Sequence, residues 1–424
     1  MWYDKLLQIW KIKDLRRNLL FVFALLIVFR VLAHIPIPVV NIANLRDFFS
    51  SNQVLGLLNL FSGGGMENFS IVMLGVGPYI TASIIFQLLV MIIPSLEEMS
   101  KDPQGSQKIN QYTRILAAPL ALLQSYAMIT LLRQSSRGIV ADMDFMGLIT
   151  TMITISAGTM LLMWIGELIS EKKIGNGISL LIFVGIITGI PGAIMRTFAV
   201  LDSSQIFSLL VFAFVAIVTI VGVVIITEGQ RNIPVSYARQ IRGQRMYGGS
   251  NTYLPLRVNM AGVIPIIFAV SIILFPPMIA QFFLRAKTEF LVRAAEFTIQ
   301  VFQNQLVYGV LYFVFIFAFT YFYTAVIFHP TQIAENLQKQ GGFIPGIRPG
   351  RHTADYLAAT ISRMNFAGAL FLGLIAVLPL ALNSFFGLQS LVIGGTSVLI
   401  VVSVVIETIK QIGAQLTMRD YEGL

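Results

Sequence analysis

Residues 75–80 of the chain read Gly-Val-Gly-Pro-Tyr-Ile and residues 262–267 read Gly-Val-Ile-Pro-Ile-Ile, so both match the pattern G-V-x-P-x-I. A second pattern, G-x-S-x-x-I, also occurs twice, as Gly-Ile-Ser-Leu-Leu-Ile at residues 177–182 and as Gly-Thr-Ser-Val-Leu-Ile at residues 395–400. Each copy stands at the start of an apolar run. The first pattern falls on the second and seventh runs and the second pattern on the fifth and tenth, which predicts a duplicated unit of five apolar segments.

The composition indicates a membrane protein. Hydrophobic residues make up 56% of the 424 residues and charged residues only 12%, whereas soluble globular domains carry about 25% charged residues. An apolar run of about 18 residues or more can cross a hydrocarbon core of about 30 Å as a helix. The sequence therefore predicts an all-α polytopic membrane protein with ten transmembrane helices. The ten apolar runs lie at residues 19–36, 71–93, 115–132, 148–168, 178–199, 206–227, 260–281, 306–328, 361–381 and 391–409.

The distribution of basic residues predicts how the spans are oriented. When the connecting segments are assigned alternately to two sides, one side has 20 Lys and Arg residues and the other has 7. Because basic residues collect on the cytoplasmic side, both termini are predicted to be cytoplasmic. A unit of five spans is odd, so its second copy enters the membrane from the opposite face. We therefore expect two inverted halves, residues 1–200 with helices 1–5 and residues 201–424 with helices 6–10.

The segment before the second span departs from a simple helix bundle. Residues 59–70 read Asn-Leu-Phe-Ser-Gly-Gly-Gly-Met-Glu-Asn-Phe-Ser, which is too polar and Gly-rich to cross lipid and too apolar for an ordinary linker. Non-helical backbone at membrane depth is tolerated where protein or a water-filled cavity surrounds it. The sequence therefore favours a re-entrant segment in a vestibule on the external side, and the alternative is a surface loop that joins spans one and two.

Two cytoplasmic connections are long, at about residues 228–258 and 329–353. Long loops between short ones are commonly functional, and the second loop contains a turn-rich Pro-Gly-Ile-Arg-Pro-Gly stretch that presents an arginine on a stiff backbone. We expect docking surfaces for a cytosolic partner, although these charges could serve only to fix orientation. The arginines in these connections are Arg231, Arg239, Arg242, Arg245, Arg257, Arg348 and Arg351.

Several chemical functions lack their sequence signatures. The chain has no Cys, no G-x-x-x-x-G-K-[ST] loop and no H-E-x-x-H motif, and its three His residues are scattered without metal-ligand spacing. We therefore expect no catalytic residues, no metal and no cofactor, and since the chain should not hydrolyse ATP itself, any energy has to come from elsewhere. The net charge of +9 follows largely from the topology. Direct nucleic-acid binding is not expected, because the basic residues are not interleaved with exposed aromatic residues.

Few ionisable residues fall inside the predicted spans. Arg30, Glu167, Glu228 and Glu407 all lie within a few residues of a span end, where a long side chain can reach the interface. Ion-coupled transporters usually place carboxylates nearer the middle of the membrane. The pattern therefore favours a passive conduit, with these four side chains directed to the interface.

Five strings are distributed over nearly the whole chain: Phe-Ser-Gly-Gly at residues 61–64, Gly-Pro-Tyr-Ile-Thr-Ala-Ser-Ile-Ile at 77–85, Gly-Asn-Gly-Ile-Ser at 175–179, Val-Asn-Met-Ala-Gly-Val-Ile-Pro at 258–265 and Pro-Gly-Ile-Arg-Pro-Gly at 345–350. Together they closely resemble motifs of the SecY family, the central channel subunits of the bacterial protein translocon. The resemblance implies two five-helix halves around an hourglass pore that conducts unfolded polypeptide. It also implies a lateral opening between helices two and three of one half and helices seven and eight of the other.

The resemblance also implies particular site residues. An apolar ring at the waist would exclude water and ions, while branched side chains could part around an extended chain. The ring positions that the motifs imply are Val76, Ile80, Ile178, Ile182, Ile267 and Ile400. The implied plug comprises about residues 61–70, with Phe61, Ser62, Gly63, Gly64, Gly65, Met66, Glu67 and Asn68 as its central residues. The polar residues expected at the lateral gate are Thr81, Ser83, Gln87 and Asn259, which could hydrogen-bond across it or, alternatively, serve only in permanent helix packing.

The implied partners follow from the family. They are SecE and usually SecG in the membrane, the ATPase SecA or a translating ribosome at the cytoplasmic loops, signal peptides, unfolded precursors and membrane lipids, all at the bacterial cytoplasmic membrane. Two residues depart from the family pattern. The tip of the first long loop reads Gln244-Arg245 instead of a basic pair, and one ring position is Val76 instead of the more frequent Ile.

Two other classes of function remain open at this point. Inverted repeats also occur in secondary transporters of small solutes, which would show saturable, gradient-driven uptake. A non-conducting membrane scaffold would need no pore, and the Gly/Pro-broken helices argue mildly against it.

Overall fold

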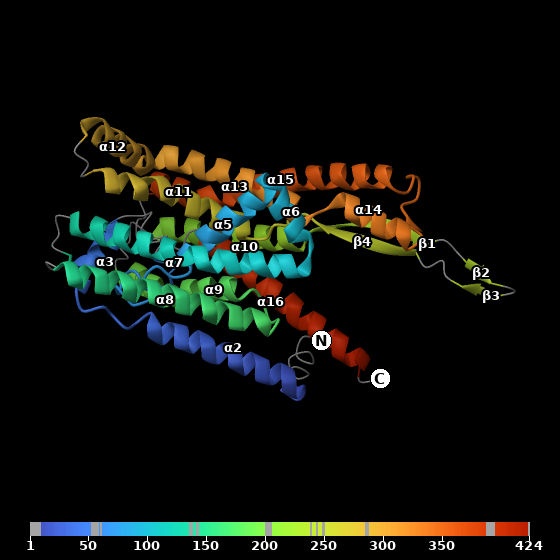
Figure 1. Ribbon diagram of the computed structural model, residues 1–424, viewed down its shortest axis with the longest axis horizontal. Helices are drawn as coiled ribbons and strands as arrows, with labels where there is room; N and C mark the ends of the chain where they lie inside the picture. Colours follow the sequence, from blue (N-terminus) through green and yellow to red (C-terminus); the bar gives the residue numbers. More distant parts are fainter. Residues whose placement is uncertain are drawn as a thin grey trace.

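The molecule is an elongated bundle of helices with a small sheet at one end (Figure 1). The computed structural model describes residues 10–51, 59, 62–134, 139–140, 144–199, 206–237, 240–242, 245–247, 251–284, 288–386 and 395–422. The predicted helical class is confirmed. Each of the ten apolar runs contains a long helix, and these are α2 (Lys13–Leu32), α5 (Gly77–Ile92), α7 (Pro103–Gln134), α8 (Phe145–Glu171), α9 (Gly177–Ala199), α10 (Ile206–Glu228), α11 (Ile264–Phe283), α13 (Gln305–Ile327), α15 (Arg351–Phe386) and α16 (Gly395–Glu422).

Fewer than ten of these helices are long and apolar enough to count as membrane spans. Among the described residues five helices are long and apolar enough, and the pair α5 and α6 (Pro94–Lys101) adds a sixth across a bend of 106°. The bend follows from Pro94, since the residue before a proline avoids the helical region and Ile93 is extended, with φ −103° and ψ 110°. The second span is also shorter than predicted, because residues 71–76 form turns before α5.

Three further helices lie between the long ones: α3 (Ile42–Ser51), α12 (Glu289–Gln303) and α14 (Pro330–Lys339). The sequence prediction treated all three as connections. The helix α12 is amphipathic. It carries the charged residues Glu289 and Arg293 as well as apolar residues such as Ala295, which is buried. An amphipathic helix too short to span a membrane fits the end of a bundle, where one side meets water.

The second sequence pattern marks equivalent helix starts. α9 begins at Gly177 and α16 at Gly395, the first residues of the two copies. The serine two positions later is buried in both, with Ser179 6% and Ser397 3% exposed. The duplicated pattern therefore forms the same element at both sites.

The two long connections form a sheet that the sequence prediction did not foresee. β1 (Gln230–Tyr237) pairs antiparallel with β4 (Asn251–Arg257), and β5 (Gly342–Phe343) from the second connection pairs with the other edge of β1. Ile233 and Val235 are buried, whereas Asn232 and Pro234 are exposed, which is the alternation of a half-buried strand. A separate hairpin of β2 (Gln240–Arg242) and β3 (Arg245–Tyr247) extends beyond this sheet.

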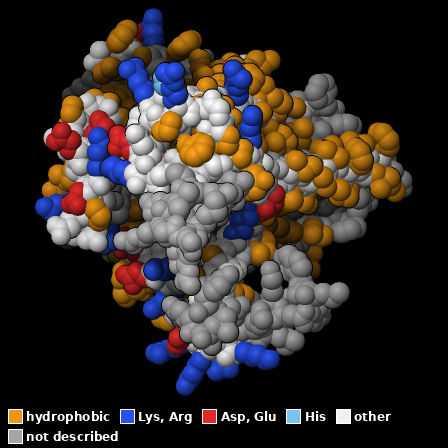
Figure 2. Space-filling view, turned by 90° about the vertical axis from the view of Figure 1, so that its right-hand side faces the viewer, with side chains coloured by type: hydrophobic (Ala, Val, Ile, Leu, Met, Phe, Trp, Pro, Cys, Tyr) orange, Lys and Arg blue, Asp and Glu red, His pale blue; other side chains and the backbone are white. Residues whose placement is uncertain are grey.

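The sheet lies at the end of the bundle where α2 begins and α16 ends (Figure 1). Its buried residues share a hydrophobic cluster with α15, through Leu357 and Ile361. Viewed from this end, Lys and Arg side chains are spread over the face, with some acidic side chains among them (Figure 2). The two long connections are therefore joined in one sheet at an end of the bundle that carries many basic side chains.

Candidate functional site

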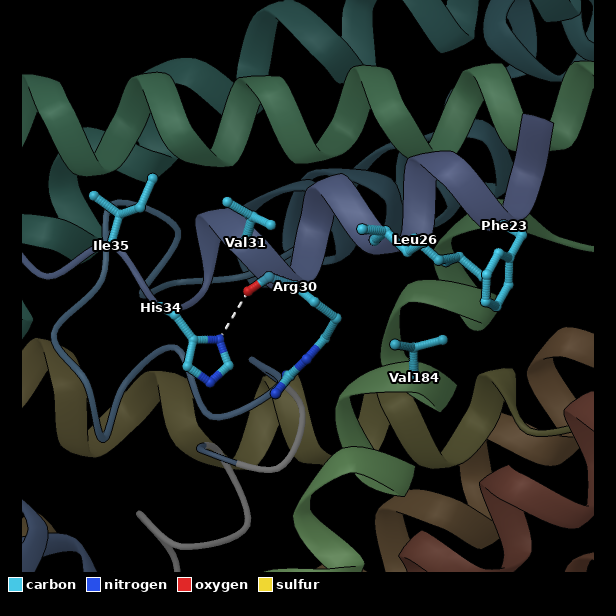
Figure 3. A pocket seen from close by; sticks show the side chains of 8 residues that line it. Phe23, Leu26, Arg30, Val31, His34, Ile35 and Val184 are labelled. Atoms are coloured by element: carbon cyan, nitrogen blue, oxygen red, sulfur yellow. Dashed lines mark hydrogen bonds between the residues drawn. The ribbon is translucent and has the colours of Figure 1, made fainter. Parts of the chain in front are cut away.

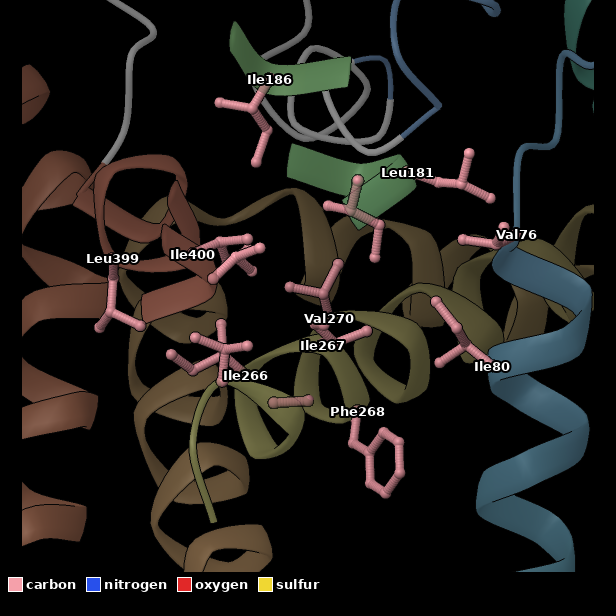
Figure 4. Packing of buried hydrophobic residues seen from close by; sticks show 14 of the residues in the cluster. Val76, Ile80, Leu181, Ile186, Ile266, Ile267, Phe268, Val270, Leu399 and Ile400 are labelled. Atoms are coloured by element: carbon pink, nitrogen blue, oxygen red, sulfur yellow. The ribbon is translucent and has the colours of Figure 1, made fainter. Parts of the chain in front are cut away.

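The largest hydrophobic cluster lies where the repeated patterns meet. Five of the six predicted ring residues belong to it and are at most 8% exposed, and the sixth, Ile178, is partly buried against it. They come from α5, α9, α11 and α16, which are the helices that begin at the four pattern copies. Figure 4 shows Val76, the N-cap of α5, and Ile80 of α5 facing the same interior as Ile267 of α11 and Ile400 of α16. The structure thus brings residues more than 300 positions apart into one apolar centre.

The same centre contains residues that the sequence prediction did not select. Leu181 and Ile186 of α9 and Ile266 and Val270 of α11 are at most 5% exposed and lie beside the ring positions (Figure 4). A helical period of 3.6 places such residues on adjoining faces of the same helices. The sequence carried no signal that separates them from the ring.

The predicted plug forms compact turns before α5. Its Gly63 and Gly64 have φ of 70° and 79°, and Phe69 has φ of 45° while being fully buried. The Ser62 hydroxyl accepts a hydrogen bond from the Met66 amide over 3.2 Å, and Ser62 and Met66 are 2% and 4% exposed. The segment is therefore a folded piece inside the protein instead of an exposed linker. Phe61 lies outside the described residues.

The plug segment is attached to the end of α2 and the chain that follows it. The Ile37 amide donates to the Phe69 carbonyl over 2.9 Å and the Ile71 amide donates to the Ile35 carbonyl over 3.2 Å. Arg46 donates from Nη2 to Asn68 Oδ1 over 3.0 Å. These contacts place the segment against the end of the bundle opposite the sheet (Figure 1).

One predicted side-chain orientation is wrong. Arg30 was expected to reach the interface, but its Nη1 donates a hydrogen bond to the Gly63 carbonyl over 2.6 Å. The nearby plug backbone offers an acceptor inside the protein, so the guanidinium is drawn inwards. The sequence could not predict this partner, because Gly63 is 33 residues away in the chain.

The helices that would border a lateral gate are in contact. α11 packs against both α5 and α7. The polar residues expected there bond within their own half: Gln87 Nε2 donates to Ser83 Oγ over 3.1 Å, and Gln124 Nε2 of α7 donates to Thr81 Oγ1 over 3.4 Å. Asn259 bonds the backbone of Gly262 through both side-chain atoms. Within the described part of the chain, none of these four side chains forms a hydrogen bond across the gate.

Within each half, polar pairs join neighbouring helices. Arg114 of α7 forms an ion pair with Glu167 of α8, and Lys410 of α16 pairs with Glu228 of α10 over 2.8 Å. Thr324 of α13 donates to Asn365 of α15 over 3.0 Å, with both residues buried. No group of three His, Cys, Asp or Glu residues that could hold a metal ion occurs in the described ranges.

The arginines of the long connections lie on the surface of the sheet end. Arg231, Arg257, Arg348 and Arg351 are all exposed. Arg242 and Arg245 are opposite one another in the β2–β3 hairpin. Arg239 and Gln244 lie outside the described residues.

Solved structures define the class of protein. A structure described as that of a protein-conducting channel matches with a TM-score of 0.63 and 17% identity, covering 92% of this chain and 90% of that one. Sec61 in the canine ribosome–channel complex matches with a TM-score of 0.61 and 17% identity over the same shares. The fold is therefore that of protein-conducting channels.

Sequence relatives define the family. The SecY family model matches residues 70–409. Protein translocase subunit SecY of Mycobacterium bovis is 44% identical over 97% of this chain and 97% of its own length, and that of Corynebacterium glutamicum is 45% identical over 99% of each. The chain belongs to the SecY family. It is a multi-pass membrane channel subunit for protein translocation.

Proposed function

We propose that Val76, Ile80, Ile178, Ile182, Ile267 and Ile400 form the seal of the translocation pore. The observation that carries this proposal is the single apolar cluster into which four helices, each starting at a repeated pattern, bring these residues. An apolar constriction raises the energy of water and ions within it, and its flexible side chains can separate for a polypeptide. The saturable small-solute transporter is the less favoured alternative, because the relatives are translocase subunits.

We also propose that residues 61–70 act as a plug on the external side of this seal. The described part of the segment is folded against α2 and precedes the turns of residues 71–76 that lead into α5, where Val76 is the N-cap and Ile80 lies in the first turn. One of the matched structures is described as showing that the plug domain of its SecY protein stabilises the closed state of the channel and maintains a membrane seal. Movement of the segment would uncover the pore, while the contact of α11 with α5 and α7 would open for lateral release.

The sheet end is proposed to be cytoplasmic, with both termini there and residues 1–200 and 201–424 as the two halves. The excess of basic residues in the connections on this side supports the orientation. Exposed arginines on paired loops suit a cytosolic partner, the SecA ATPase or a ribosome, because the chain has no phosphate-binding loop of its own. SecE and SecG are the proposed partners within the bacterial cytoplasmic membrane.

A photo-crosslinking experiment tests the pore assignment. A photoreactive residue replaces Ile182, which is 1% exposed in the central cluster, during SecA-driven translocation of a stalled precursor. We expect an adduct to the precursor. The control replaces Ile225 of α10, which is 61% exposed, and should give adducts to lipid or neighbouring subunits only. Absence of a precursor adduct at Ile182 would remove that residue from the pore.

A deletion tests the plug assignment. Removal of residues 62–68 is expected to raise the resting ion conductance of channels in planar bilayers. An unchanged conductance would contradict the plug proposal while leaving the pore proposal intact.

A further inference from the structure

Arg30 is a charged side chain within the first predicted span, and the pore and plug proposals give it no role. It lies near the end of α2, and its surroundings are apolar, with Leu26, Val31 and Val184 among the side chains of the pocket that it lines (Figure 3). The described residues provide no carboxylate that forms an ion pair with it. Its hydrogen bond to the Gly63 carbonyl, 2.6 Å long, therefore links a positive charge to the plug backbone.

Gly63 is seated so closely that a larger residue would have to displace its neighbours. A Cβ at this position would lie 2.8 Å from Cζ of Phe29 in α2 and 3.1 Å from Cα of Gly185 in α9. Its φ of 70° is also in the left-handed region that favours glycine. The plug backbone is thus inserted between α2 and α9 at the point where Arg30 holds it.

The two ends of the plug segment are held by different kinds of bond. Near Ser70, two backbone hydrogen bonds to residues 35 and 37 and the bridge between Pro36 and Ser70 form a short antiparallel connection. At Gly63, the bond to α2 comes from one long side chain. A side chain of this length can release and rebind without unfolding a backbone pairing. The Ser70 end therefore suits a hinge and the Gly63 end a releasable contact.

The strength of the Arg30 bond depends on water. A hydrogen bond from a charged donor is stronger than one between neutral groups, and stronger in apolar surroundings than in water. Once the pore hydrates, water can solvate both the guanidinium and the carbonyl, which weakens the bond. Release of the plug from Arg30 and hydration of the pore therefore favour one another.

We propose that Arg30 is a positioning residue that latches the plug in the closed channel through the Gly63 carbonyl and releases it when the pore becomes wet. This inference rests on the proposed plug function. In this proposal the Arg30 side chain holds the plug in its closed position. A substitution at Arg30 removes this contact and leaves the hinge at Ser70 intact.

A thiol-accessibility experiment measures the latch. The chain has no Cys, so Met66→Cys introduces a single thiol at a plug residue that is 4% exposed. The complex in membranes is treated with a membrane-impermeant maleimide from the plug side. Arg30→Met, which keeps an unbranched side chain but is two bonds shorter and cannot donate, is expected to raise the modification rate about tenfold, the change that about 1.4 kcal/mol produces. Arg17→Met, an exposed arginine of the same helix, should leave the rate unchanged.

The same variants are measured for resting ion conductance beside the deletion of residues 62–68. A higher conductance for both Arg30→Met and the deletion supports the latch. An unchanged modification rate in Arg30→Met overturns it, even if the deletion raises conductance. If the deletion alters nothing, the plug proposal fails, whereas the modification rate still decides whether Arg30 holds the segment. Should Arg30→Met not accumulate, Arg30→Gln replaces it with the same expectation, because its amide is two bonds shorter and cannot reach Gly63.

Discussion

Gly75 and Gly262 have the same left-handed backbone conformation, with φ of 58° and 62°. Each is followed by a valine at the N-cap with φ of −94°, and by a helix with proline in its first turn. The repeated G-V-x-P-x-I pattern therefore encodes one local structure twice: a glycine that turns the chain, and a proline whose fixed φ suits the start of a helix.

The left-handed turn at Gly262 predicts that replacing this glycine lowers the stability of the protein through backbone strain alone, without a change in packing. A Cβ at Gly262 would meet no atom within 4 Å, so Gly262→Ala should destabilise only through its φ, by about 1–2 kcal/mol. Gly262→Asn should cost less, because asparagine tolerates this conformation. Thermal unfolding midpoints of the purified complex measure both. Equal midpoints for the wild type and Gly262→Ala would contradict the φ assignment.

Close contact between α8 and α9 predicts a packing cost at the second pattern. A Cβ at Gly177 would overlap the backbone carbonyl of Gly166, so Gly177→Ala has to push the helices apart at a cost of about 1–3 kcal/mol. Gly413→Ala is the matched control within α16, since a Cβ there meets nothing within 4 Å. It should stabilise the helix by about 0.5–1 kcal/mol. Opposite shifts of the unfolding midpoint are expected, and shifts of the same sign would refute the packing argument.

The apolar centre predicts an ion leak when a ring side chain is shortened. Ile400 is fully buried in the central cluster, whereas Ile409 of the same helix is 43% exposed. Ile400→Ala should raise the resting conductance and cost about 2–5 kcal/mol of stability, because it leaves a cavity. Ile409→Ala should have little effect on conductance. A leak of the same size in both variants would mean that Ile400 does not contribute specifically to the seal.

The exposed arginines of the paired loops predict a docking defect. Arg348→Glu places a negative charge on the turn-rich segment beside β5 and should slow SecA-driven translocation about tenfold, as loss of one strong charged contact implies. Arg293→Glu provides the control, since Arg293 lies on α12 at the other end of the bundle (Figure 1). Translocation rates and SecA binding are measured for both. Equal activity of the two variants would show that Arg348 takes no part in docking.

The sequence by itself determined the class, the ten long apolar helices and the positions where the repeated helices begin, but not the shorter helices α3, α12 and α14. In a bilayer every backbone polar group has to be hydrogen-bonded within the protein, so long apolar runs form helices. Basic residues in the loops predict which side of the membrane each loop is on. The repeated glycines marked helix starts because their conformations are local properties of the chain. The same reasoning found five buried members of the apolar centre, since the family motifs selected them together.

Only the tertiary structure decided which partner each remaining residue meets. Ile178 and Ile182 are one helical turn apart in α9, yet Ile182 is fully buried and Ile178 only partly, because burial depends on the helices packed opposite. Ser236 and Phe343 pair across two separate loops, and Arg30 turns inwards to Gly63. These contacts join residues far apart in the chain, so the local periodicity and charge that predict helices carry no information about them.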